Sequence, residues 1–242
     1  MPVEPARTPV GRDLEAVTFD ALGTLVRLEA PAPRLRESLR ERYGLDVPID
    51  RCEAAMRAEM AHYRAHCREA SDPAALATLR LECAWVLAEV LALGPGGPEL
   101  LPALGDAIAY RVYPDALHAL DRVQAAGLTV GVLSNWDVSI HDALRRLGIL
   151  DRFAAVVVSA EIGAEKPERA AFEAAAAALG AVPHRILHVG DDPERDVDGA
   201  LAAGFWALLV QRDAAPAVRR PRVATLAELP ALLDLDHGNH DG

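Results

Sequence analysis

Four short segments, far apart in the chain, each end with a reactive polar residue after a largely apolar run. The residues at these ends are Asp20, Ser134, Lys166 and Asp191. Three of the runs are typical of buried parallel strands. Ligands of open parallel sheets bind just beyond the carboxyl ends of the strands. The order therefore predicts that two carboxylates, a hydroxyl and an ammonium converge on one crevice.

Asp20 is the candidate nucleophile of this crevice. It ends the run Val17-Thr18-Phe19 and meets a Gly23-Thr24 turn. A carboxylate in that position can attack an electrophilic phosphorus or carbon and form a covalent intermediate. An aspartate that only caps a turn would be the simpler interpretation in isolation, but the three partner segments favour the nucleophile.

The combined motifs resemble the haloacid dehalogenase (HAD) superfamily of hydrolases. Its pattern is Asp-x-Asp-x-Thr after the first strand, Ser or Thr after the second, Lys beside a helix start, and Gly-Asp-x-x-x-x-Asp after the fourth. The matching residues here are Asp20 with Thr24, Ser134, Lys166, and Asp191 with Asp196. The resemblance runs from about Glu15 to about Val210 and implies an enzyme of the hydrolase class.

The resemblance implies a single Mg²⁺ at the two carboxylates. Asp20 and Asp191 would coordinate it directly, and the backbone carbonyl of Leu22 would add a ligand. Mg²⁺ suits such a site because it is a hard ion that takes few protein ligands and keeps waters. Asp196 and Asp192 are expected to be outer or alternative ligands, or else to cap the following helix.

The remaining polar residues are expected to bind the substrate. The resemblance implies that Ser134 and the Asn135 amide donate hydrogen bonds to a phosphoryl oxygen, and that Lys166 neutralises its charge and holds the nucleophile. Thr24 completes the candidate substrate-binding set, and the candidate catalytic residues are Asp20, Ser134 and Lys166. The simpler alternatives are a turn hydroxyl for Ser134 and a solvated surface lysine for Lys166.

Leu22 departs from the family pattern, because most phosphatases of the family carry a second aspartate there. That aspartate protonates the leaving alcohol and then activates water, and leucine can do neither. Three interpretations stay open. The protein could be a phosphohydrolase that acts through a phospho-aspartyl form of Asp20 and is weakened or altered by Leu22, or a catalytically degenerate protein that binds a metabolite or partner. It could also be a 2-haloacid dehalogenase, because halide leaves its substrate without a proton. The acidic residues around Asp191 favour the phosphohydrolase, because phosphoryl transfer needs a cation.

The elements that must position these residues predict an α/β fold. Short apolar runs at 15–20, 128–133, 155–159, 185–189 and 206–210 alternate with helical patterns at 115–126, 140–147, 168–179 and 196–203, and a short closing helix is expected at 226–233. Such alternation predicts a Rossmann-like, three-layer α/β/α arrangement with a parallel sheet. The long helical stretch between the first two strands is too long for a simple crossover, and predicts an inserted helical cap domain. We expect a core of residues 13–27 and 114–233, a C1-type cap over 28–113, and a frayed tail over 234–242.

The composition limits the kinds of molecule that the protein is expected to bind. The net charge of −11 argues against a nucleic acid, whereas a local lysine and a metal ion can still attract a small phosphorylated molecule. No apolar run reaches the roughly 18 residues of a membrane span. Residues 1–12 show no hydrophobic stretch typical of a signal peptide, so a cytoplasmic location is expected.

Several other residues invite functional interpretations but favour structural ones. We expect Trp136 to pack under the cap, Asp137 to cap a helix, and His62 and His66 to lie on a solvated cap face. His188 lies within a strand and is expected to be a core residue with a satisfied ring. The cysteines lack metal-ligand spacing and are expected to be reduced packing residues: Cys52, Cys67 and Cys83.

Overall fold

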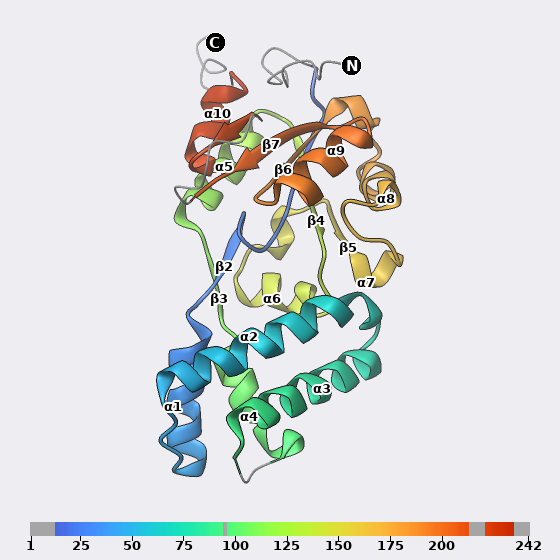
Figure 1. The fold of residues 1–242 in the computed structure, drawn as a ribbon. Coiled ribbons are helices and arrows are strands. Elements are labelled where there is room, and N and C mark those ends of the chain that lie inside the picture. Colours follow the sequence, from blue (N-terminus) through green and yellow to red (C-terminus); the bar gives the residue numbers. More distant parts are fainter. Residues whose placement is uncertain (1–12, 94–95, 213–220, 235–242) are drawn as a thin grey trace, which may run out of the picture.

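A parallel sheet of six strands lies at the centre of the computed structural model, which describes residues 13–93, 96–212 and 221–234 (Figure 1). The strand order is β5-β4-β1-β6-β7-β8, and every pairing is parallel. The strands are β1 (Ala16–Phe19), β4 (Thr129–Ser134), β5 (Ala155–Val158), β6 (Ile186–Gly190), β7 (Trp206–Val210) and β8 (Arg222–Val223). The predicted Rossmann-like sheet is confirmed, and β8 is an additional edge strand.

Apolar side chains cover both faces of the sheet. On one face, Val17 and Phe19 pack against α5 (Pro114–Ala125), α6 (Ile140–Arg146) and α10 (Leu229–Leu232). On the other face, Ala16 packs with residues of α8 (Arg169–Leu179) and α9 (Gly199–Ala202). Because side chains alternate along a strand, Thr18 lies on the α8 face with Ala16. This alternation decides which polar residues of the sheet can meet.

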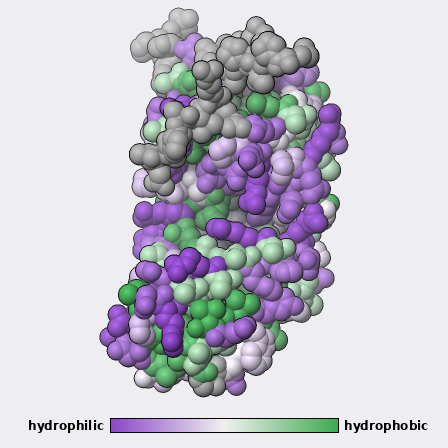
Figure 2. All heavy atoms as spheres, viewed as in Figure 1, coloured by the Kyte–Doolittle hydropathy of each residue, from purple (hydrophilic) through white to green (hydrophobic). Residues whose placement is uncertain are grey.

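A helical body lies below the sheet in Figure 1, joined to it by β2 (Val26–Leu28) and β3 (Tyr110–Val112). These two strands pair antiparallel. The body contains α1 (Pro31–Tyr43), α2 (Ile49–His66), α3 (Pro73–Leu91) and α4 (Gly97–Ala107), and its buried residues form an apolar cluster of their own. All three cysteines are free and buried there. The visible face of this body shows apolar residues (green) gathered over α3 and α4 (Figure 2).

Some element boundaries differ from the expectation. The helix expected at 196–203 begins earlier, as a π-helical turn over Pro193–Asp198 that continues into α9, because Asp192 caps it and Pro193 occupies the first helical position. The remaining helical segments are short: 3₁₀ turns over Cys67–Glu69, Leu150–Arg152, Pro183–Arg185 and Leu226–Glu228, and α7 (Ser159–Ile162). Residues 1–12 and 235–242, and with them nearly all of the expected frayed tail, lie outside the described residues. None of the helices that the structure describes is long and apolar enough to cross a membrane.

Candidate active site

Asp20 lies at the carboxyl end of the central strand and is held by two neighbours. Lys166 Nζ donates to Asp20 Oδ1 over 2.6 Å, and Ser134 Oγ donates to the same oxygen over 3.2 Å. All three side chains are buried. Both contacts fall on Oδ1. The structure thus brings together the three residues that the sequence predicts as catalytic.

Lys166 is the only lysine among the 242 residues, which otherwise use arginine as the cationic side chain. Its ammonium lies between two carboxylates, 2.6 Å from Asp20 and 2.6 Å from Asp196. Burial acts to lower the pKa of Lys166, but the carboxylates of Asp196 and Asp20 outweigh it and keep the pKa above its ordinary value. A compact point charge fits this gap, whereas a planar guanidinium presents a wider fork.

Asp196 anchors the ammonium from the opposite side. Its Oδ1 accepts from Lys166 and from His188 Nε2, the latter over 3.1 Å, and its Oδ2 accepts from the backbone N–H of Asp192 over 2.9 Å. Burial alone would raise the pKa of Asp196, but Lys166 and His188 hold it well below the usual range. Asp196 is therefore an ionised partner of Lys166.

Two glycines give the carboxylates their space. A Cβ on Gly23 would lie 2.1 Å from Asp191 Oδ2, and a Cβ on Gly190 would lie 2.1 Å from Asp196 Cγ. Gly23 also has φ +94°, a backbone conformation that L side chains rarely adopt. The close approach of the acidic side chains to the strand ends thus depends on glycine at both positions.

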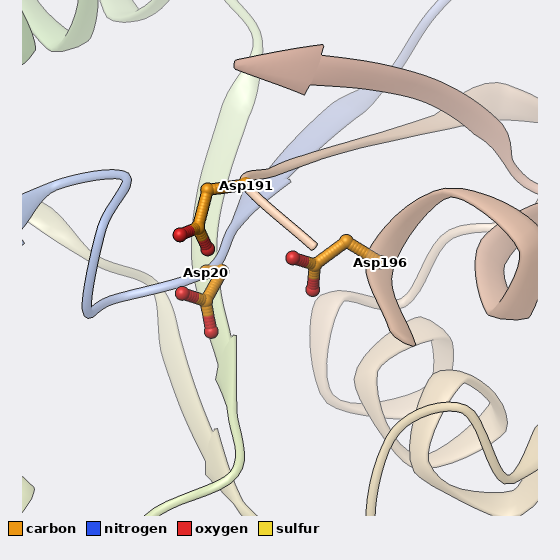
Figure 3. Close-up of side chains that lie close together, drawn as sticks. All are labelled: Asp20, Asp191 and Asp196. Carbon is orange, nitrogen blue, oxygen red and sulfur yellow. The ribbon is translucent and has the colours of Figure 1, made fainter. Parts of the chain in front are cut away.

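Asp20, Asp191 and Asp196 form an acidic cluster that could hold a metal ion (Figure 3). One ligand oxygen from each lies within 4.8 Å of the others. Asp191 is the exposed member of this cluster. Desolvation of its carboxylate, followed by the nearby charges of Asp20 and Asp196, raises the pKa of Asp191 to about 7. Burial likewise raises the pKa of Asp20, opposed by Lys166. When all three acids are ionised, the single ammonium of Lys166 leaves two negative charges uncompensated.

The donor set fits a divalent cation of the Mg²⁺ type. Mg²⁺ prefers carboxylate and carbonyl oxygens, and a charge of +2 would balance the cluster. Within the described part of the chain no other residue donates a hydrogen bond to the Asp191 carboxylate, in contrast to Asp196, both of whose oxygens are engaged by other residues. Asp20 and Asp191 are thus the acids with free coordinating capacity, and Asp196 has the less available oxygens.

The structure also places the remaining residues of the predicted site. The side chain of Asn135 exchanges two hydrogen bonds with the main chain of Lys166, at 2.9 and 2.8 Å, so it positions the lysine. Thr24 is completely buried, and its hydroxyl has no hydrogen-bond partner within the described part of the chain. Asp192 caps the following helical turn, which is one of the two roles expected for it. Leu22 is half-buried against the core.

The helical body touches the core close to this site. Tyr63 Oη donates to Asp137 Oδ2 over 2.7 Å, only three residues beyond Ser134. The backbone N–H of Val138 donates to the carbonyl of Ala70 over 3.3 Å. Trp136 is buried with its ring 5.0 Å from that of Tyr110, in agreement with its expected packing. Asp137 also accepts from the N–H of Ser139, but the sequence did not reveal its contact with Tyr63.

The fold and the site together define an α/β protein with a buried aspartate beyond the end of its central strand. A family model described as haloacid dehalogenase-like hydrolase matches residues 14–204. The chain therefore belongs to the haloacid dehalogenase-like hydrolases, which confirms the resemblance of the motifs.

Several relatives are phosphatases. The chain is 33% identical over 137 residues to a phosphoserine phosphatase of Thermus thermophilus, covering 54% of this chain and 55% of the relative. It is 37% identical over 150 residues to phosphatase MT3486 of Mycobacterium tuberculosis, covering 61% and 68%. A glyceraldehyde 3-phosphate phosphatase of Methanopyrus kandleri is 39% identical over 41% of this chain and 43% of the relative. The chain thus spans about half the length of the first and third of these relatives.

Solved structures share the fold over nearly the whole chain. The HAD-hydrolase YfnB from Bacillus subtilis, bound to magnesium, has a TM-score of 0.72 at 16% identity and covers 91% of this chain and 99% of its own. The defluorinating L-2-haloacid dehalogenase Rha0230 has a TM-score of 0.72 at 20% identity and covers 95% and 99%. Identities this low bear on the fold alone.

Proposed function

We propose that this hydrolase is a Mg²⁺-dependent phosphohydrolase that acts on a small phosphorylated metabolite through a phospho-aspartyl form of Asp20. The observation that carries the proposal is the charge balance of the cluster. When Asp20, Asp191 and Asp196 are all ionised, they supply three negative charges against one ammonium. A nucleophilic carboxylate approaches a phosphate dianion only where cations offset both charges.

Asp20 and Asp191 would hold the ion together with the backbone carbonyl of Leu22, and Mg²⁺ would supply positive charge beside the phosphoryl oxygens. Lys166 would place a second positive charge against the transferring group. Ser134, which already donates to Asp20, would turn its hydroxyl to a phosphoryl oxygen. These donors are fixed by burial before substrate arrives, which is the condition for strong transition-state stabilisation.

The reaction has two displacements. A carboxylate oxygen of Asp20 attacks phosphorus, the bond from phosphorus to the ester oxygen breaks, and the leaving oxygen keeps the electron pair and takes a proton from solvent. Water then attacks the phosphorus of the aspartyl phosphate, which releases inorganic phosphate and restores the Asp20 carboxylate. Leu22 can neither donate a proton to the leaving oxygen nor accept one from the attacking water. We therefore infer a preference for substrates whose leaving group needs little protonation.

We further propose that residues 28–113 act as a cap over this site. The support is the contact between Tyr63 and Asp137 and an exposed ion pair between Arg68 and Glu168, with 2.9 Å between nitrogen and oxygen. Both join the helical body to loops that follow Ser134 and Lys166. Substrate selection would then depend on residues of α2 and on the Asn135–Asp137 loop.

A dehalogenase is the second candidate, and Leu22 favours it. Asp20 could attack carbon and expel halide, a step that needs no acid. The charge balance separates the two candidates, since halide displacement requires no divalent cation to neutralise an incoming dianion.

The decisive test is a screen with aryl, acyl and alkyl phosphates and with 2-haloacids, each with Mg²⁺ and with EDTA. We expect phosphate release that EDTA abolishes, that Mg²⁺ restores, and that Asp20→Asn eliminates. Release of halide that persists in EDTA would establish the dehalogenase. No Asp20-dependent turnover of either class would leave the degenerate binding protein.

A further inference from the structure

We propose that His188 is a positioning residue that acts through Asp196 to fix the Lys166 ammonium against Asp20. The inference rests on the proposed function, because it assigns Asp20 the role of nucleophile. It concerns a residue that lies in the middle of β6 and is completely buried, where the simpler interpretation is a core histidine.

Both ring nitrogens of His188 are engaged. Nε2 lies 3.1 Å from Asp196 Oδ1, and Nδ1 lies 2.9 Å from Thr18 Oγ1. Because an ionised carboxylate only accepts hydrogen bonds, Nε2 must carry a proton. Burial lowers the pKa of His188 and so favours the neutral ring, which has no second proton for Nδ1. Nδ1 is then the acceptor, and the Thr18 hydroxyl donates to it. The edge of Phe172 faces the ring at 5.4 Å and 89°, so packing fixes the plane of the imidazole as well.

The sheet explains why these groups meet. Thr18 and His188 lie directly opposite each other in the parallel pairing of β1 and β6, and their side chains point to the α8 face. Two residues further along β6, Gly190 has no Cβ, and Asp196 occupies that space. The Asp196 carboxylate thus lies beside the His188 ring and can reach across to Lys166.

The hydrogen bonds form a chain that begins on β1 and returns to the residue just beyond its end. Thr18 holds His188, His188 holds Asp196, Asp196 holds Lys166, and Lys166 holds Asp20. Thr18 lies in β1, and Asp20 directly follows the last residue of that strand. Each link spans 2.6 to 3.1 Å.

Lys166 needs such a support because its stem has four flexible carbons and its ammonium has three rotatable donors. Asp196 supplies the fixed acceptor only if its own carboxylate does not rotate. The Asp192 N–H holds one oxygen, and His188 restrains the other. Loss of the His188 donor would allow the Asp196 carboxylate to rotate. The distance between the Lys166 ammonium and Asp20 would then no longer be fixed.

The test compares three variants of the full-length protein. His188→Met keeps the apolar volume but removes the Nε2 donor, and His188→Gln keeps an N–H donor near that position. Leu187→Ala, on the neighbouring buried position of β6 and the opposite face, is the matched control for lost core packing. Steady-state kinetics use p-nitrophenyl phosphate with saturating Mg²⁺, and thermal denaturation is measured for each variant.

A second readout follows from the single lysine. Protein labelled with ¹³C-lysine gives one Cε–Hε signal, which reports Lys166 without assignment. We expect His188→Met to shift or broaden this signal and to lower kcat about 10- to 100-fold, the usual cost of losing an outer partner of a functional ligand, with KM changed less than about twofold. His188→Gln should recover part of kcat. Leu187→Ala should lower the melting temperature and leave the lysine signal in place.

The outcomes separate this inference from the function on which it rests. If His188→Met lowers only the melting temperature, and leaves kcat and the lysine signal as in wild type, His188 is a core residue and the inference is overturned. If the wild type hydrolyses nothing, the proposed function fails, and the lysine signal alone decides whether His188 positions Lys166. If His188→Met does not fold, Thr18→Val removes the donor to Nδ1 and should move the same signal; an unmoved signal overturns the inference.

Discussion

Replacing Gly23 by alanine should disable the site while leaving the fold in place. The new Cβ would lie 2.1 Å from Asp191 Oδ2, and ordinary van der Waals contact begins at 3.4 Å. The carboxylate must therefore retreat by about 1.3 Å, and misplacement of a reacting group by about 1 Å can cost about 100-fold in rate. We expect kcat/KM for an aryl phosphate to fall about 100-fold, which corresponds to about 2.7 kcal/mol of transition-state stabilisation.

The same substitution also strains the backbone, so a control must separate the two effects. Gly23 has φ +94°, and a side chain in such a conformation costs about 1–3 kcal/mol of stability. Gly44 also has a positive φ, +69°, but an added Cβ there meets nothing within 4 Å. Gly44→Ala should therefore lose stability to a similar extent and keep wild-type kinetics.

The assays are phosphate release at varied Mg²⁺ and thermal denaturation with and without Mg²⁺. Wild type and Gly44→Ala should be stabilised by Mg²⁺, and Gly23→Ala should not, because Asp191 has left the cluster. If Gly23→Ala binds Mg²⁺ and turns over substrate as well as Gly44→Ala does, the assignment of Asp191 to the metal site is refuted.

Three further substitutions probe the charges of the molecule. Leu22→Asp should raise hydrolysis of alkyl phosphates by at most about 10²- to 10⁴-fold, the usual contribution of a general acid, and a folded variant with no gain would argue against a missing acid as the only defect. Lys166→Met leaves Asp20 and Asp196 buried without their cation, so the free energy of unfolding measured in urea should fall by about 3–5 kcal/mol. An unchanged midpoint of the urea transition would contradict the buried ion pair. Burial raises the pKa of Glu59 in α2, so ionisation of this carboxyl lowers the stability of the folded protein. This loss of stability is absent below the unfolded pKa near 4.5 and complete above the folded pKa. Glu59→Gln should therefore raise the melting temperature at pH 8, and the gain should vanish as the pH falls toward 4.5; a gain that did not depend on pH would show that the carboxylate is not the cause.

The sequence predicted the sheet and the meeting of the charged residues because both depend on short-range patterns. Buried parallel strands are continuous apolar runs, and their carboxyl ends lie at one edge. The strands at 26–28 and 110–112 were not predicted, since three residues are too few to show a period and their pairing spans the whole helical insertion. The helix after β6 begins at Pro193, earlier than the predicted residue 196, although Asp192-Pro193 is a cap followed by a first-position proline.

The roles of single residues were harder to predict than their presence, because they depend on partners remote in sequence. His188 was expected to be a core residue with a satisfied ring, and its ring is satisfied, but by Thr18 and Asp196. Asn135 was expected at the substrate, yet its side chain holds the main chain of Lys166. In both cases a one-dimensional pattern gives the residue type and its place near a strand, whereas the contact depends on a partner far away in the sequence: the register of β1 and β6 for His188, and the position of the loop around Lys166 for Asn135.

The charge of the cluster links these observations to the choice of lysine at residue 166. The chain carries 25 basic residues, and only this one is a lysine. An arginine there would bring a fork of five donors into a gap where two carboxylate oxygens lie 2.6 Å from one nitrogen. It would also fill space that a phosphoryl group enters in the proposed reaction. A single compact cation neutralises one of the three acids. In the proposed reaction the two remaining charges would attract a divalent ion, and no wider side chain would obstruct the substrate. The lone lysine and the acidic cluster are thus one arrangement, and His188 of β6 together with Asp196 of the following helical turn keeps the ammonium in place.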